Sequence, residues 1–405
     1  MNRFTRQMAS YLQQFGAVVR NEFRTIFTDG GVLLILVFAM LIYATVYSLA
    51  YGSQVLRNVP IGVVDACRTA TSRSLIETFN AGPNTYVAYE PTDMEEAREL
   101  FYGRKIYGVV YIPSDYERKL VGGSQADVAI YCDASYFLMY RQVFQELVTT
   151  IGQTGAMVEF RRLIAKGADI PQAQAVTQPV IYQSHNLFNP YLGYGTFVMP
   201  AIIIVIIQQT MLIGIGMIGG TWREHGLYRK LRPAGRGRMS TLPIVLGRAT
   251  VYALIYAVTC AYVLGLHYRM FHFPMNGQTG AVALFTAVYL AACIAMSIAV
   301  STLFRYRENS LLLLLWTSIP VLMLSGISYP REGIPEWMFA LGKLFPSSHG
   351  VNGFIRIQTM GASLGEVFAE IKWLVILTVA YGGLACIGIH QVIRREERER
   401  CGKGE

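Results

Sequence analysis

Six long apolar runs set the pattern of the chain, one near its start and five in its second half. Each run holds 19 to 25 residues and at most one ionisable side chain, His267 in the third run and His390 in the sixth. A helix needs about 20 apolar residues to cross the hydrocarbon core of a bilayer. The pattern predicts an α-helical integral membrane protein with six transmembrane helices, over residues 31–52, 196–220, 249–268, 280–304, 311–329 and 373–393.

The segment between the first two runs has the pattern of a water-soluble domain. Short runs of β-forming residues alternate there with helical stretches, which is typical of a small α/β fold. Apolar spacing then predicts a long helix from Tyr140 to Ile164, which Pro171 and Pro179 are expected to break. Strands are predicted at 60–65, 85–90, 107–112 and 127–132, and helices near 71–80, 93–103 and 113–121.

The residues before the first run form an amphipathic pattern. Arg3, Arg6, Arg20 and Arg24 stand among the polar positions, as in a helix lying on the inner membrane surface. Packing of the same helix against the transmembrane bundle explains the pattern equally well. The apolar positions at helical spacing are Phe4, Met8, Leu12, Phe15, Val19, Phe23 and Ile26.

The net charge of +9 gives the topology and does not indicate a nucleic-acid partner. The insert is nearly neutral, with 12 Lys and Arg against 14 Asp and Glu, so the excess lies in the membrane half. When the N-terminus, the loop after the second run, the turn after the fourth run and the C-terminus are placed on one side, that side holds 18 Lys and Arg. The short segments on the other side hold five. Since basic loops stay cytoplasmic, both termini are predicted inside and the insert outside.

This topology gives a predicted domain organisation. The first run is expected to be retained, because its 22 residues exceed the apolar core of a signal peptide. The predicted parts are a lead-in helix at 1–30, a span at 31–52, an extracytoplasmic α/β domain at 53–195, five spans at 196–393 with a cytoplasmic loop at 221–248 and an external segment at 330–372, and a tail at 394–405.

The chain has no recognisable catalytic or nucleotide-binding motif. Its six histidines are scattered, and no G-x-x-x-x-G-K-[ST] loop occurs. The glycines of 214–219 match the letters of a dinucleotide motif, but they lie inside an apolar run and are interpreted as helix-packing positions. The sequence therefore predicts a protein that is not an enzyme and carries no cofactor or metal. Ion-driven transport is also disfavoured, because the runs hold no carboxylate.

Two polar features remain open. Gln208 and Gln209 are the most polar residues in the middle of a run; they either line a path through the membrane or bond to a neighbouring helix. Cys67 and Cys132 each fall at the end of a predicted strand on the oxidising side, where they could form a disulfide if those strands are neighbours.

Three stretches carry a resemblance to a known family. The first is Arg20-Asn21-Glu22-Phe23 with residues 26–29, although Thr28 replaces the usual Arg. The second is Arg223-Glu224-His225-Gly226 with Leu231, Pro233 and Gly247-Arg248, although Leu227 and Arg229 depart from the pattern. The third and most specific is Leu324-Ser325-Gly326, Pro330, Ile334-Pro335-Glu336-Trp337, Phe345-Pro346, Gly353-Phe354, Arg356 and Gly361.

With these motifs the chain resembles the permease subunits of ABC type-2 exporters. Its insert is similar to that of the branch with a large external domain, through Pro60 to Asp65, Ser72-Arg73, Gly108 to Pro113, Tyr116-Glu117 and Tyr131-Cys132-Asp133. The resemblance implies a half-transporter in a bacterial inner membrane. A second permease subunit, either a copy or a paralogue, would pair with it, and separate cytoplasmic ATPase subunits would bind ATP and Mg²⁺. Membrane lipid surrounds such a protein. In a double-membrane cell the external domain could also dock a periplasmic adaptor, which the sequence neither shows nor excludes.

The resemblance also implies roles for particular residues. The second and fifth spans would line the route, with Gln208, Gln209, Thr317 and Pro320 as lining candidates. The external segment would form a re-entrant pair of short helices, with Pro335 at a helix start, Trp337 at the membrane interface and Pro346 as a stop. Contact with the ATPase would involve Glu22, Phe23, Arg24, Arg223, Glu224, Gly226, Leu231 and Pro233.

The function predicted from the sequence is export of an amphipathic or hydrophobic substrate, powered by a separate ATPase. The charge-free runs favour such a cargo over an inorganic ion. The alternative is a membrane-anchored envelope binding or assembly protein without transport activity. Charge reversal at Glu224 separates the two, because it would uncouple a transporter and leave an anchor unchanged.

Overall fold

A computed structural model describes the chain except residues 1–2, 182, 229–230, 232–237 and 402–405. The chain divides into two compact units, one of Met1–Gln54 with Asn186–Glu405 and one of Val55–His185. Each unit has a hydrophobic core of its own. The second unit falls within the predicted insert.

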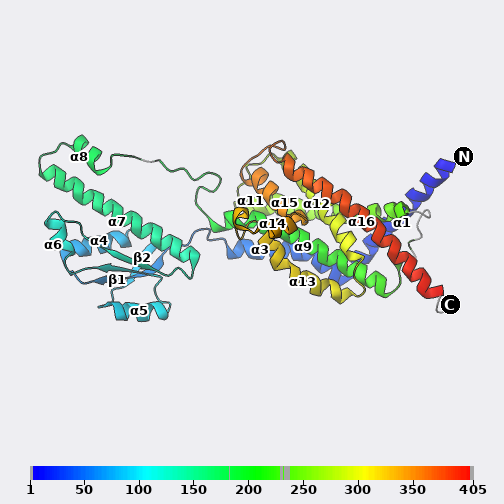
Figure 1. Ribbon diagram of the computed structural model, residues 1–405, viewed down its shortest axis with the longest axis horizontal. Coiled ribbons are helices and arrows are strands. Elements are labelled where there is room, and N and C mark those ends of the chain that lie inside the picture. The colour runs from blue at the N-terminus through cyan, green and yellow to red at the C-terminus, as the bar shows by residue number, and fades with distance from the viewer. Residues whose placement is uncertain (1–2, 182, 229–230, 232–237, 402–405) are drawn as a thin grey trace. The chain divides into compact units, whose positions relative to one another are not determined.

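The smaller unit is a sheet between two layers of helices, which confirms the predicted α/β class (Figure 1). Its strands lie in the order β2-β1-β3-β4, with β4 antiparallel to β3 and the other pairs parallel. Phe79, Val143 and Leu147 of α4 and α7 pack on one face, and Ala97 of α5 packs on the other. The elements are β1 Val59–Asp65, α4 Ala70–Asn80, β2 Thr85–Tyr89, α5 Met94–Tyr102, β3 Gly108–Ile112, α6 Tyr116–Val121, β4 Ala129–Cys132, α7 Phe137–Ala165 and α8 Ile170–Thr177.

The long helix α7 is confirmed, but the prediction that Pro171 and Pro179 break it is wrong. The helix ends at Ala165, and Gly167 follows with a φ of +91°. The amide of Ala168 donates to the Leu163 carbonyl at 3.0 Å, which closes the helix in the manner of a Schellman motif. Pro171 lies in the first turn of α8, where a missing amide hydrogen costs nothing.

The question of a disulfide between Cys67 and Cys132, left open by the sequence, is answered by the structure, in which both thiols are free. Strand β3 lies between β1 and β4, so the strands that carry the two cysteines are not neighbours. Cys132 is also opposite Gly108, at the end of the sheet where β1 and β3 begin, whereas Cys67 follows the end of β1. Burial raises the pKa of the Cys132 thiol to about 11, so this thiol stays protonated at neutral pH.

Five helices of the larger unit are long and apolar enough to cross a membrane, and they match five of the six predicted spans. Two of them, the first and the third, contain a π-turn. The five are Gly30–Ala50 (α2, η1 and α3), Tyr194–Glu224 (α9), Leu242–Met270 (α10, η4 and α11), Thr279–Ser301 (α12) and Phe368–Glu399 (within α16, Phe368–Cys401).

The predicted fifth span, 311–329, corresponds to α13 Arg307–Leu324, which is not among those five. This helix begins with charged residues in its first turn and ends before Gly326, whose φ is +86°. Its 18 residues extend about 27 Å at 1.5 Å per residue. A membrane crossing by α13, and with it the six-span count, stays a prediction.

Two short helices follow α13, in the place of the predicted re-entrant pair. Pro335 caps the start of α14 Glu336–Gly342, as predicted, and Trp337 is exposed. The prediction that Pro346 acts as a stop is wrong, because α14 has already ended and Pro346 is the first residue of α15 Pro346–Phe354. A π-turn, η6 Ile355–Thr359, continues α15, and short 3-10 turns occur at Arg238–Thr241 and Arg331–Gly333.

Helix α9 is the centre of the larger unit and packs against α3, α12, α13 and α15. Its glycines let neighbouring side chains approach its backbone. A methyl group added at Gly214 would lie 2.4 Å from Leu36, and one at Gly219 would lie 2.7 Å from the Ser301 side chain. The interpretation of 214–219 as packing positions is confirmed.

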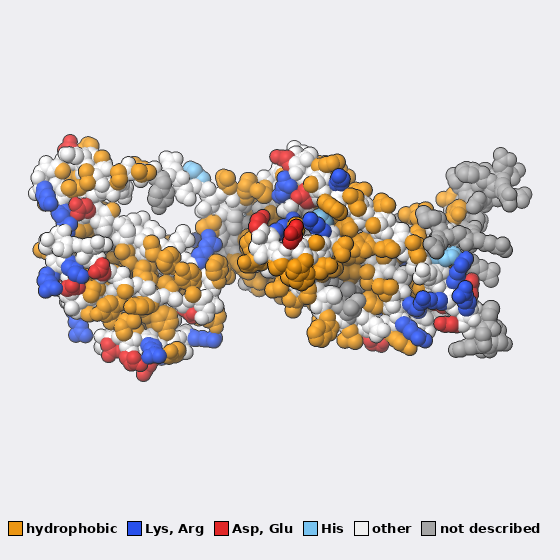
Figure 2. Space-filling model, in the orientation of Figure 1, with side chains coloured by type: hydrophobic (Ala, Val, Ile, Leu, Met, Phe, Trp, Pro, Cys, Tyr) orange, Lys and Arg blue, Asp and Glu red, His pale blue; other side chains and the backbone are white. Residues whose placement is uncertain are grey.

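Apolar and basic side chains occupy different parts of the larger unit. Apolar side chains cover its middle, and Lys and Arg side chains gather at the end where both termini lie (Figures 1 and 2). This distribution agrees with the charge asymmetry that predicts cytoplasmic termini.

We predict that Gly219→Ala destabilises the larger unit by about 1–3 kcal/mol, the usual cost of overpacking. The added methyl group would meet the side chain and carbonyl of Ser301 at 2.7 and 2.8 Å. Thermal unfolding in detergent measures the effect. Gly382→Ala in α16 is the control, since a methyl group there meets nothing within 4 Å; equal unfolding temperatures for the two variants would contradict the packing role.

Candidate functional site

A fully buried ion pair joins the lead-in helix α1 Arg3–Thr28 to α10. Arg248 Nε donates to Glu22 Oε1 at 2.8 Å, and the Tyr252 hydroxyl donates to the same oxygen. Neither charged side chain has any exposed surface. An unpaired charge in such a position is very costly, so each residue requires the other.

Two aromatic rings, one in the last turn of α9 and one in the loop after it, lie beside this pair. The Arg248 guanidinium lies 5.5 Å from the ring centre of Trp222, which is within the range of a cation–π contact. Trp222 in turn packs edge-on against Tyr228, with ring centres 5.6 Å apart. The ion pair thereby links α1 and α10 to the end of the central helix.

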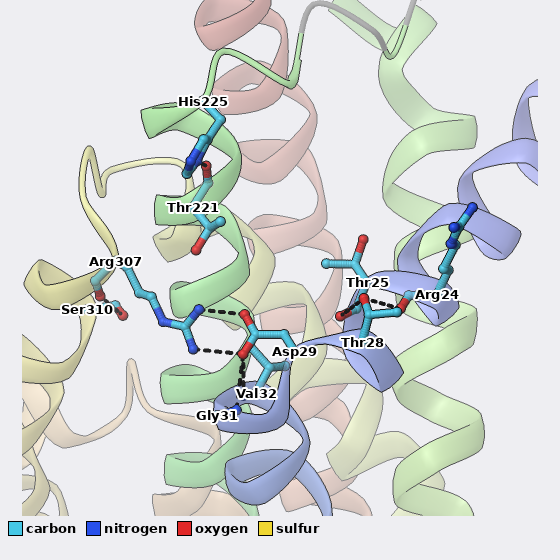
Figure 3. Close-up of polar contacts among 10 residues, drawn as sticks. All are labelled: Arg24, Thr25, Thr28, Asp29, Gly31, Val32, Thr221, His225, Arg307 and Ser310. Atoms are coloured by element: carbon cyan, nitrogen blue, oxygen red, sulfur yellow. Dashed lines mark hydrogen bonds and ion pairs between the residues drawn. The ribbon is translucent and has the colours of Figure 1, made fainter.

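A second ion pair lies nearby and is partly exposed. The Arg307 guanidinium donates to both carboxylate oxygens of Asp29, at 2.9 Å from Nη2 to Oδ1 (Figure 3). The same carboxylate accepts from the amides of Gly31 and Val32 and so caps the first membrane helix. Hydrogen bonds from Arg307 hold the pKa of Asp29 below its usual range, against the opposing effect of burial.

The end of α9 has a fixed shape that requires glycine. Gly226 has a φ of +58°, its amide donates to Arg223, and the Leu227 amide donates to the Trp222 carbonyl at 2.8 Å. These bonds form a Schellman motif, in which a residue other than glycine is strained. Arg223 Nη1 also donates to the Thr302 carbonyl at 3.0 Å, which ties α9 to the end of α12. We call the part that contains Glu22, Asp29, Arg223, Arg248 and Arg307 the charged end.

The predicted coupling residues divide into interior and surface positions. Glu22 and Leu231 are buried, Arg223 is half-buried, and Gly226 shapes the turn, so these four hold the charged end together. Pro233 lies outside the described residues. The side chains on the surface are Phe23, Arg24 and Glu224. Of the predicted coupling residues in the described part of the chain, these three are therefore the ones that can touch a partner directly.

Helix α1 combines the two interpretations of its amphipathic pattern. Its Val18, Glu22 and Ile26 are buried against the bundle, with Val18 in contact with α10 at Gly247. Its Leu12, Phe23 and Phe27 are exposed, and the last two rings stack 4.5 Å apart. Packing against the bundle is confirmed, and contact of the exposed face with the membrane surface stays a prediction.

The pairing of Glu22 with Arg248 was not predicted, although the sequence contains signals for it. Glu22 is four residues from both Val18 and Ile26 and so falls on the buried face of α1. Arg248 is the only charged residue in α10, and it directly precedes the predicted span at 249–268. A lone acid on an apolar face and a lone base in an apolar helix each need a partner, which makes the pairing recognisable.

The two mid-membrane glutamines of α9 have different surroundings. Gln208 is fully buried, and its Oε1 accepts from the Ser347 amide at 2.7 Å. It therefore supplies the acceptor that the first turn of α15 needs, since Phe345 makes no capping bond. The interpretation of Gln208 as a residue that bonds to a neighbouring helix matches this geometry.

Gln209 faces a groove of about 540 Å³ bounded by α3, α9 and α13. Its side-chain amide has no hydrogen-bond partner among the described residues. Thr317 and Pro320 of α13 do not line the groove; Ser318 and Ile319 do. The full lining is Tyr43, Tyr47, Ile202, Val205, Ile206, Gln209, Thr210, Ile213, Leu311, Leu312, Leu315, Ser318, Ile319 and Leu322, with no charged residue.

Comparison with known proteins gives consistent results over nearly the whole chain. The family described as "ABC-2 family transporter protein" matches residues 30–387. A protein of Escherichia coli K12 named "Probable multidrug ABC transporter permease YbhR" is 21% identical over 91% of this chain and 96% of its own length. Another of the same organism, "Inner membrane transport permease YhhJ", is 25% identical over 92% and 96%. "ABC transporter G family member 20" of Dictyostelium discoideum is 21% identical over 89% of this chain and 48% of its own length.

We predict that Glu22→Leu or Arg248→Met alone destabilises the protein by about 3–5 kcal/mol, because each leaves a buried charge unpaired. The double variant should recover most of the loss, since it leaves no buried charge. Thermal or denaturant unfolding of the four proteins in one detergent forms the cycle. Losses that simply add in the double variant would contradict the pairing.

We also predict that the Asp29–Arg307 pair stabilises the protein only above acidic pH. The unfolded carboxyl has a pKa of about 3.9, and the folded value is lower. The stabilisation is thus fully present above about pH 5 and disappears as the pH falls through the folded pKa. The unfolding temperature of Asp29→Asn should approach that of the wild type over this acid range; a gap independent of pH would contradict the assignment.

Proposed function

The chain belongs to the ABC-2 family of transporter proteins, as a permease subunit, and on this premise we propose that it forms half of the membrane path of an exporter. A separate cytoplasmic subunit would bind and hydrolyse ATP. The location that fits this role is a bacterial inner membrane with both termini in the cytoplasm. The basic side chains at the end with both termini support this orientation (Figure 2).

The groove between α3, α9 and α13 is the observation that carries the proposal. Its volume of about 540 Å³ falls in the range of about 300–1,000 Å³ that is usual for small-molecule sites. Its walls are apolar apart from the side chains of two tyrosines, Gln209, Thr210 and Ser318. An apolar wall with few polar groups and no charge suits an amphipathic or hydrophobic cargo, because it offers no solvation to an inorganic ion.

A second permease subunit would complete this path. The side of α13 next to the groove exposes Leu315, Trp316 and Ile319 at 71%, 80% and 67% of their surface. Two such faces brought together would enclose the groove between the subunits. This arrangement keeps the predicted role of the second and fifth runs in lining the route.

Movement of the ATPase would reach the groove through α9. Phe23, Arg24 and Glu224 are the surface residues that we propose for contact with the ATPase. Glu224 is the last residue of α9, and Gln209 lies about four turns before it on the same helix. The ion pairs of the charged end would make α1, α9 and α10 move together.

We predict that Glu224→Arg lowers export per ATP hydrolysed several-fold, because it reverses the charge at the proposed contact. The complex reconstituted in proteoliposomes with its ATPase subunit gives both rates. Glu397→Arg is the control, since Glu397 is also exposed near the same end but lies in the terminal part of α16. Unchanged export per ATP in Glu224→Arg would contradict the contact role of Glu224, whereas no ATP-dependent export by either the wild type or the variant would favour an envelope-anchored assembly protein.

We predict that Leu315→Trp lowers export of an apolar dye about tenfold, equivalent to about 1.4 kcal/mol, by narrowing the groove. Val379→Trp in α16 is the control, because Val379 is 72% exposed but does not line the groove. The measurement is ATP-driven uptake of the dye into inverted membrane vesicles, whose cytoplasmic face points outward. Equal losses in both variants would contradict a cargo path through the groove.

A further inference from the structure

A second cavity lies between α10–η4 and α12. Its volume is about 390 Å³, and it shares no lining residue with the groove. Small side chains leave the space open between the two helices. They are Ala257, Ala261, Gly265, Ala283 and Ala287. We call this cavity the slot.

The slot has a polar end and an apolar end. Arg269, Gly277, Thr279 and Gln358 line it where η4 and α12 meet the connecting loop. The Gln358 carbonyl accepts from the Asn276 amide at 3.0 Å, which places Gln358 beside that loop. Arg269 is the only charged residue of the lining, so the polar end of the slot carries a positive charge and no acidic side chain.

Two buried polar atoms in the slot have no hydrogen-bond partner among the described residues. They are the Gln358 side-chain nitrogen and the Thr286 hydroxyl oxygen. Both residues line the slot, and they are only 2% and 6% exposed. Buried polar groups are nearly always hydrogen-bonded, so two donors without partners in one cavity indicate an occupant that accepts hydrogen bonds.

The dimensions of the slot match one leaflet of a bilayer. Along α12 its lining extends from Thr279 to Leu290, which is about 17 Å at 1.5 Å per residue. Half of a hydrocarbon core of about 30 Å is about 15 Å. Arg269 comes at the end of the apolar helix Leu242–Met270, where a lipid headgroup would lie.

We propose that the slot binds one anionic phospholipid. Its acyl chain occupies the apolar end between α10–η4 and α12, and its phosphate pairs with Arg269. The Gln358 amide donates to an ester carbonyl of the same lipid. The absence of acidic residues among the slot's described lining favours an anionic over a zwitterionic headgroup. The site is independent of the proposed cargo path, because it uses neither the groove nor the charged end.

The test compares two glycines that both have room for a larger side chain. A side-chain carbon built at Gly265 in the slot, or at Gly383 in α16, meets nothing within 4 Å. Gly265→Phe fills the slot, and Gly383→Phe is the control. Each protein is extracted from phosphatidylglycerol nanodiscs, and native mass spectrometry counts the lipids that it retains. The unfolding temperature of each protein is then measured with and without added phosphatidylglycerol.

The expected result is one retained phosphatidylglycerol in the wild type and in Gly383→Phe, and none in Gly265→Phe, which the added lipid also fails to stabilise. Arg269→Gln, at an exposed position, should weaken phosphatidylglycerol binding about fivefold, the effect of one basic residue near an anionic lipid. Its binding of phosphatidylcholine should not change. Equal retention in the two glycine variants, or equal affinity of wild type and Arg269→Gln for phosphatidylglycerol, would overturn the proposal.

Discussion

The buried pair of Glu22 and Arg248 is the constraint on which the charged end of the membrane unit depends. Both charged side chains are fully buried, and a buried charge is stable only when it is paired, so the two side chains have to meet. This requirement fixes the lead-in helix against α10, although nothing in the amphipathic pattern of α1 demands that position. Trp222 extends the same cluster to α9, the helix around which the bundle packs. Together these contacts give the protein a rigid connection from its surface to its core.

Features set by local physical chemistry could be predicted from the sequence. Hydrocarbon requires long uncharged helices, so five apolar runs were sufficient to locate five membrane helices. Alternating runs likewise gave the four strands of the smaller unit within one or two residues at most positions. The glycines from Gly214 to Gly219 could be interpreted as packing positions, because a dinucleotide motif needs a strand before it and a polar loop.

Features set by tertiary arrangement could not be predicted. The order of strands is not encoded in their positions along the chain, which is why Cys67 and Cys132 seemed able to pair. The same residue type also acts differently in neighbouring positions: Gln208 bonds to α15, whereas Gln209 faces the groove. Which of two adjacent side chains points to a cavity depends on helix rotation, and this is decided by packing. Glu22 had the right motif, yet its burial places it behind the surface that a partner would touch.

The claim that this chain is the membrane half of an ATP-driven transporter is tested most directly by gentle extraction from native membranes. The tagged chain should be purified in a mild detergent and its stoichiometric partners identified by mass spectrometry. We expect a soluble nucleotide-binding subunit in equal amount, with ATPase activity in the purified complex. Reproducible recovery of envelope proteins alone, with no ATPase subunit and no ATP hydrolysis, would contradict it.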